Sequence, residues 1–195
     1  MIAPGIHCRP EDGTYTPAQP YDVEAAKEFL ANSTYESTDV LSIIVVAGSK
    51  EEGVCKIIQG NLQDIGINAE MKALDGSSYS TLLGEGNFDI SLYTTLPSLY
   101  DCNLIYQYYT PGTVRFDDSK FEGKEEMGRL ALASLTEMDE EARTDIFRQM
   151  INIMNEEALM LPLYQDCNTF CFNGDVTNID AIPGTNVRIA EWKWS

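Results

Sequence analysis

Residues 57–93, IIQGNLQDIGINAEMKALDGSSYSTLLGEGNFDISLY, decide the fold of this chain. Apolar residues recur at helical spacing up to Gly66, alternate with polar residues over 67–74, and recur over 88–94. The stretch therefore predicts a helix that stops at a glycine, a half-exposed strand, a short helix over 78–83 and another strand. This order of elements is typical of an α/β ligand-binding lobe, and none of its side chains is suited to bond-making chemistry.

A further strand and helix precede this stretch. Residues 41–47, LSIIVVA, form a β-branched run that suits a strand covered on both faces. Ser49 followed by Glu52 matches a capping box at the start of the helix. Two strand–helix–strand units then follow one another, which predicts right-handed crossovers and a mainly parallel sheet of 41–46, 67–74 and 88–94.

The flanks predict three more helices and a few strands. Asp22 is a suitable N-cap for a helix to residue 32, and two long helices are expected over 123–136 and 139–159. Residues 161–165 are expected to form a strand. The expected buried stripe of the last helix consists of Ala142, Ile146, Met150, Ile153 and Ala158.

The chain is long enough for one substantial core, so residues 21–195 are expected to form one domain. Residues 1–20 contain four prolines and no sustained apolar period, which predicts a linker or extended surface segment.

Three stretches resemble the family 5 extracellular solute-binding proteins, which serve peptide and nickel ABC importers. They are 57–93; YDVEAAKEFL at 21–30, similar to the family's YDxxxAKxLL helix; and 141–164, which ends in EEALMLPLY where the family has EEAPxxPLY. The resemblance implies the C-terminal lobe of a type II periplasmic-binding-protein-like fold, a three-layer α/β sandwich with a mainly parallel sheet. Family members have two lobes, so it also implies that the partner lobe is absent from this chain.

The expected binding site follows the third parallel strand, because ligands collect beyond the carboxyl ends of such strands. The loop over 96–103 offers hydroxyls, aromatic surface and one carboxylate. An ordinary strand-to-helix connection, capped by Asp101 or Asn103, is the alternative. The predicted ligand-binding residues are Tyr93, Thr94, Thr95, Ser98, Tyr100 and Asp101, with Thr113 at the margin.

Two ligand motifs of the family are altered here. Peptide-binding members often carry a Trp-x-x-Asp, whose positions are Thr95 and Ser98 in this chain. Nickel-binding members carry Tyr-Asp-Pro and Pro-Gly-His, where this chain has 100–102 and 111–113, with Thr113 in place of the histidine. Imidazole is the usual nitrogen donor for Ni²⁺, so no protein ligand to a metal is predicted. A small peptide or a nickel or other metal chelate is the expected ligand.

Charge and motifs exclude several classes of protein. The formal net charge of −18 argues against a nucleic-acid partner, which needs a basic face. A solvated surface is the ordinary explanation of such a charge, and a field that attracts cationic peptides or metal is the alternative. The sequence has no GxSxG, no glycine-rich phosphate loop and no CxxC. We therefore expect no enzyme and no cofactor.

The five cysteines are too few and too irregular for a disulfide scaffold. Cys167 and Cys171 would share a face of a strand but lie too far apart to bridge directly. A zinc site would need more ligands than the single histidine, His7, supplies. Packing residues or free thiols are therefore expected, with a disulfide through Cys8 as the alternative.

The resemblance implies the solute-binding component of an ABC importer, in which two lobes close around the ligand and then meet permease subunits. No apolar run is long enough to cross a membrane. An extracellular or periplasmic lipoprotein, anchored through an upstream leader, is expected. The alternatives are the ligand-sensing lobe of a cytoplasmic transcriptional regulator and an interaction module that has lost its cleft.

Overall fold

The computed structural model describes residues 6–92, 102, 109–113, 120–164, 171, 173–177 and 192–194. The chain forms two compact units. Unit 1 comprises Met1–Ala18, Leu96–Pro111 and Lys120–Ser195, and unit 2 comprises Gln19–Thr95 and Gly112–Ser119. The division into a linker over 1–20 and a single lobe over 21–195 stays a prediction.

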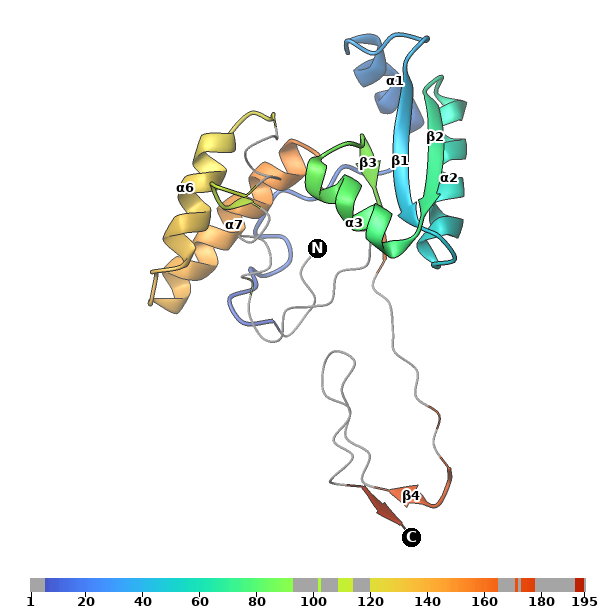
Figure 1. Cartoon of the computed structure of the whole chain (residues 1–195). Coiled ribbons are helices and arrows are strands. Elements are labelled where there is room, and N and C mark those ends of the chain that lie inside the picture. The colour runs from blue at the N-terminus through green and yellow to red at the C-terminus, as the bar shows by residue number, and fades with distance from the viewer. Residues whose placement is uncertain are drawn as a thin grey trace. The chain divides into compact units, whose positions relative to one another are not determined.

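Unit 2 is built on a parallel sheet of three strands. β1 (Val40–Val46) lies in the middle, between β2 (Asn68–Leu74) and β3 (Ile90–Ser91), as Figure 1 shows. Both pairings of β1 are parallel, and the β1–β2 register extends over the whole of both strands. The predicted parallel sheet is therefore confirmed.

Both faces of β1 are buried. Ile43 and Val45 pack with Cys55 of α2 (Glu51–Asp64) in one cluster, whereas Ile44, which points to the opposite face, is equally buried. Helix α3 (Gly76–Glu85) also packs on β1. A strand covered on both faces explains the β-branched run, because apolar side chains on either side of the strand leave water.

Two predictions concern the ends of α2, of which one is confirmed and one is wrong. Gly66 follows the helix with a φ of 93°, and its N–H donates to the carbonyl of Gln63 at 3.0 Å. The glycine stop is therefore confirmed. The capping box is wrong: the helix begins after Lys50, and the Glu52 carboxylate accepts from the N–H of Gly48 at 3.0 Å.

The first helix of unit 2 is α1 (Val23–Ala31), and its predicted cap is confirmed. The carboxylate of Asp22 accepts hydrogen bonds from the backbone N–H groups of Glu24 and Ala25, each at 3.0 Å. These two N–H groups have no partner within the helix, so the side chain supplies one.

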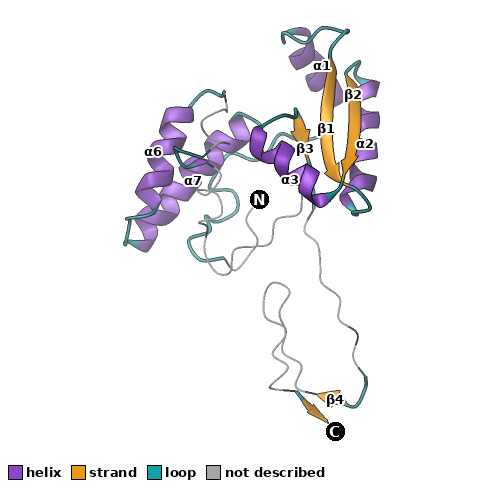
Figure 2. Ribbon diagram, viewed as in Figure 1, coloured by secondary structure: helices purple, strands orange, loops and turns teal. Residues whose placement is uncertain are grey.

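Unit 1 contains α6 (Lys124–Ser134) and α7 (Glu140–Glu156), which run side by side in Figure 2. Asp139 caps α7 as predicted, through the N–H of Ala142 at 2.9 Å. A separate antiparallel pair, β4 (Val176–Thr177) and β5 (Lys193–Trp194), completes its described elements.

The buried face of α7 differs from the predicted stripe. Only Met150 of that stripe is fully buried, and the buried residues of the helix are Phe147, Met150, Ile151, Met154 and Asn155. The reason is that residues 6–18 also lie against α7. Asn155 donates from Nδ2 to the carbonyl of Thr16 at 2.6 Å, and Asn152 accepts from the N–H of Thr16 at 2.7 Å.

The same contacts correct a second expectation. Residues 1–20 were predicted to form a linker or extended surface segment, yet Cys8 and Pro10 within them are buried in unit 1. A third correction concerns residues 161–164, which form no strand in the described part of the chain. Leu161, Leu163 and Tyr164 are exposed there, so no burial stabilises the predicted strand.

Candidate functional site

The carboxyl ends of β1, β2 and β3 meet at one edge of the sheet in unit 2, because the strands are parallel. The chain leaves β1 at Ala47, β2 at Asp75 and β3 at Leu92. The N–H of Ala47 donates to the carbonyl of Leu74 at 2.7 Å, which continues the β1–β2 pairing to the very end of the sheet. In parallel α/β sheets this is the edge at which ligands bind.

The turn after β1 carries a buried hydroxyl. Oγ of Ser49 is buried and has no hydrogen-bond partner among the described residues. Buried polar atoms are nearly always paired, so this oxygen is an exception among the described residues. Next to it, Gly48 turns the chain with a φ of 74° and donates to Glu52. That N–H, together with Lys56, lowers the pKa of the Glu52 carboxyl.

The turn after β2 is built around Asp75. Its carboxylate accepts from the N–H groups of Ser77 and Ser78 at 3.0 and 3.1 Å, and from both serine hydroxyls at 2.6 Å. Three of these donors reach Oδ1 and one reaches Oδ2, so this carboxylate serves the start of α3. Asp75 is therefore a helix cap.

The end of β3 is held by Tyr79 of α3. The side chain of Tyr79 is buried, and its hydroxyl donates to the carbonyl of Leu92 at 3.2 Å. Leu92 directly precedes Tyr93, the first predicted site residue. The hydrogen bond therefore fixes the backbone where the candidate binding loop begins.

Most of the predicted site lies outside the described residues. This applies to Tyr93, Thr94, Thr95, Ser98, Tyr100 and Asp101. Thr113 is described: it is half-buried and lies in a bend just after Gly112, whose φ is 88°. The role of all seven residues stays a prediction.

The buried hydroxyl of Ser49 is a feature of this edge that was not predicted from the sequence. The signal was present: Ala47-Gly48-Ser49 follows the first buried strand, and parallel strands end at the same edge.

Metal and membrane features are reported only for the described residues. Among them, no group of three or more His, Cys, Asp or Glu side chains could hold a metal ion. None of their helices combines the length and apolar character that a membrane span requires.

Comparison with known proteins identifies a family. The family model described as "Bacterial extracellular solute-binding proteins, family 5 Middle" matches residues 7–115, which is more than half of the chain. No curated protein sequence matches the chain.

Solved structures share the fold. A dipeptide binding protein from Pseudoalteromonas sp. SM9913 in complex with Met-Leu has a TM-score of 0.69 at 18% identity, over 93% of this chain and 38% of its own. NikA from Brucella suis in complex with Fe(III)-EDTA has a TM-score of 0.61 at 19% identity, over 73% of this chain and 32% of its own. MelB from Agrobacterium fabrum C58, in complex with stachyose, has a TM-score of 0.63 at 15% identity, over 80% of this chain and 27% of its own. The fold is thus that of type II periplasmic binding proteins, and the chain spans about a third of the length of these structures.

Proposed function

Because this chain belongs to the bacterial extracellular solute-binding proteins of family 5, we propose that it is the C-terminal ligand-binding lobe of the solute-binding component of an ABC importer. Proteins of this family work with such importers and bind peptides, metal chelates or sugars. The observation that carries the proposal is the family match over residues 7–115. The parallel order β2-β1-β3 supports it, because this order gathers three strand ends at one edge.

The proposed ligand is a small peptide or a nickel or other metal chelate, enclosed between this lobe and a second one. Its wall on this side consists of Tyr93, Thr94, Thr95, Ser98, Tyr100 and Asp101, with Thr113 at the margin. Hydroxyl and amide groups would donate and accept hydrogen bonds, and Tyr100 would supply a flat apolar face.

The working cycle needs no covalent chemistry. Solute-binding proteins capture and deliver their ligand, so the proposed partners are the solute and the permease subunits of the importer. The proposed location is extracellular or periplasmic, as the family description implies, with a lipid anchor outside these 195 residues.

The test is a titration of the two-lobed protein with dipeptides, oligopeptides and nickel chelates by calorimetry. Tyr100→Ala should raise the Kd at least tenfold, since an aromatic face that leaves water contributes about 1.5–3 kcal/mol. Tyr21→Ala is the matched control, because this tyrosine is 82% exposed and lies just before α1.

Two results would count against the proposal. If Tyr100→Ala binds with the affinity of the unchanged protein while its circular dichroism is intact, the loop is an ordinary connection and the site is elsewhere. If no peptide and no chelate binds the unchanged protein, the ligand class is wrong.

A further inference from the structure

Two cysteines that are distant in the sequence are neighbours in unit 1. Cys8 and Cys102 both belong to the buried core cluster of that unit, with 5% and 1% of their surfaces exposed. The backbone N–H of Cys102 donates to the carbonyl of His7 at 3.2 Å, which joins the two segments directly. Both cysteines are thiols in the structure.

This hydrogen bond limits the distance between the two residues. The carbonyl oxygen of His7 is close to the Cα of Cys8 across one peptide unit, and the N of Cys102 is one bond from its own Cα. The two Cα atoms are therefore at most about 7.5 Å apart. Disulfides span about 4.4–6.8 Å between Cα atoms, a range that lies within this upper limit. Both side chains belong to the same buried core cluster.

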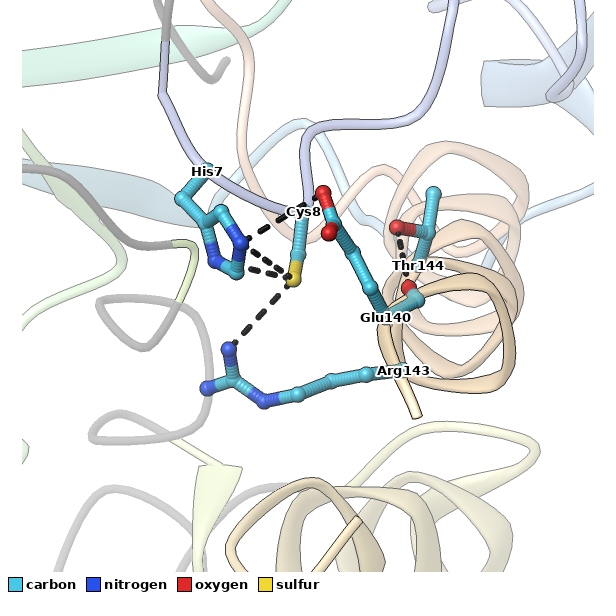
Figure 3. Close-up of polar contacts among 5 residues, drawn as sticks. All are labelled: His7, Cys8, Glu140, Arg143 and Thr144. Carbon is cyan, nitrogen blue, oxygen red and sulfur yellow. Dashed lines mark hydrogen bonds and ion pairs between the residues drawn. The ribbon is translucent and has the colours of Figure 1, made fainter. Parts of the chain in front are cut away.

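The sulfur of Cys8 has a cation and a proton acceptor beside it (Figure 3). Its Sγ lies 3.1 Å from Nδ1 of His7 and 3.5 Å from Nη1 of Arg143. Nε2 of His7 is in turn 3.4 Å from a carboxylate oxygen of Glu140. An imidazole can take the thiol proton, and a guanidinium is always charged, so both groups suit a reacting thiolate.

Arg143 is held in place by other contacts. Its Nε donates to the carbonyl of Ser134 at 3.1 Å, and its guanidinium carbon lies 5.1 Å from the centre of the Phe147 ring. The backbone of Cys8 has a φ of 58°, a left-handed conformation that residues other than glycine rarely adopt. Fixed neighbours on α6 and α7 and an unusual backbone together set the direction of the Cys8 sulfur.

We propose that Cys8 and Cys102 form a disulfide by exchange with an external disulfide, in the oxidising surroundings where extracellular proteins work. The Cys8 thiol gives its proton to His7, and the thiolate attacks one sulfur of the external disulfide. That S–S bond breaks, one thiolate leaves, and a mixed disulfide remains on Cys8. Cys102 gives its proton to the thiolate released in the first step, attacks Sγ of Cys8 and expels the second thiolate. Two protein thiols are oxidised, and one external disulfide is reduced to two thiols.

The bond has consequences for the fold and the candidate site. It closes a chain loop of 95 residues, 8 through 102, and so constrains the unfolded chain more than the folded one. It also anchors the residue that follows Tyr100 and Asp101, which ties one end of the candidate binding loop to unit 1. This second consequence rests on the proposed binding loop, and the oxidising surroundings rest on the proposed location.

The experiment is to refold the 195-residue chain in a mixture of oxidised and reduced glutathione, alkylate the remaining thiols and digest with trypsin. The sequence suits this design, because peptides 1–27 and 73–115 contain Cys8 and Cys102 as their only cysteines. The proline after Arg9 keeps the first peptide intact. Without reduction, mass spectrometry should find these two peptides as one species that separates when a reductant is added.

Matched variants test which cysteines form the cross-link and whether His7 affects its rate. Cys55→Ser and Cys171→Ser should leave the cross-linked species unchanged, and Cys8→Ser should leave peptide 73–115 alkylated. His7→Ala should slow the formation of the cross-link several-fold at neutral pH without reducing its final yield. An unchanged rate would remove His7 from the mechanism.

Three outcomes would overturn the proposal. They are a cross-link from Cys8 to the peptide over 149–188, which contains Cys167 and Cys171; glutathione on Cys8 with no protein cross-link; and full alkylation of both cysteines. None of these outcomes affects the ligand titration that tests the proposed function, so the two proposals can fail separately.

Discussion

At the scale of single residues, Asp75 shows how one side chain begins a helix and shapes a strand end. The hydroxyls of Ser77 and Ser78, followed by backbone N–H groups, donate to its carboxylate and hold its pKa well below the usual range. A carboxylate that is more acidic in the folded state stabilises the fold above its unfolded pKa. That contribution is lost as the pH falls through the folded value.

Asp75→Ala should therefore lower the melting temperature by a few degrees at pH 7. The difference from the unchanged chain should shrink as the pH falls below about 4, where the unfolded carboxyl takes up its proton. Thermal unfolding followed by circular dichroism at a series of pH values measures it. Asp64→Ala is the control: this residue ends α2, where a negative charge opposes the helix dipole, so its removal should not destabilise. If the melting temperatures of Asp75→Ala and the unchanged chain differ equally at pH 7 and at pH 3, the capping role is excluded.

At the scale of elements, the end of α7 contains a residue in an unfavourable backbone conformation, Ala158. Leu159 donates to the carbonyl of Met154 at 3.0 Å, and Ala158 donates to that of Asn155 at 3.4 Å. This is the pattern in which glycine normally follows a helix, yet Ala158 holds a φ of 51° there. The methyl group of alanine makes this left-handed conformation unfavourable.

Ala158→Gly should therefore raise the free energy of unfolding, by about 0.5–1 kcal/mol, as the strain relieved exceeds the entropy that glycine adds to the unfolded chain. Urea unfolding followed by circular dichroism measures this change. Ala26→Gly, in the interior of α1, is the matched control and should lower the free energy of unfolding by about 1 kcal/mol. A destabilised Ala158→Gly variant would show that the helix ends in another way.

The elements also show which patterns can be read along the chain. β1, α2, β2 and α3 follow from a β-branched run, helical spacing, alternation and the stop at Gly66, because these signals arise from neighbouring residues. The buried stripe of α7 could not be read in this way. It depends on residues 6–18, which are distant in the sequence and cover part of the helix.

At the scale of the whole molecule, the proposed function means that this chain forms one of the two lobes that enclose the solute. A solute held by one lobe keeps its other side in water, so it loses several hydrogen bonds at about 1 kcal/mol each. Together these losses lower affinity by orders of magnitude.

The 195-residue chain alone should therefore bind the solute of the two-lobed protein with a Kd far above the micromolar range. Calorimetry on both proteins, with the same solute and buffer, measures the difference. The two-lobed protein is the positive control for the solute preparation. Micromolar binding by the 195-residue chain would contradict enclosure between lobes.

The sequence by itself determined the family, through its match to the family model, and predicted the parallel sheet and the edge at which a ligand is expected. The sheet and the edge depend on local periodicity and on the position of each loop after its strand. The tertiary structure alone decided that Cys8 lies beside Arg143 and next to Cys102, and that Ser49 carries a buried hydroxyl. Such facts arise from contacts between segments that are far apart in the chain, or from burial by them, and no local pattern records those contacts.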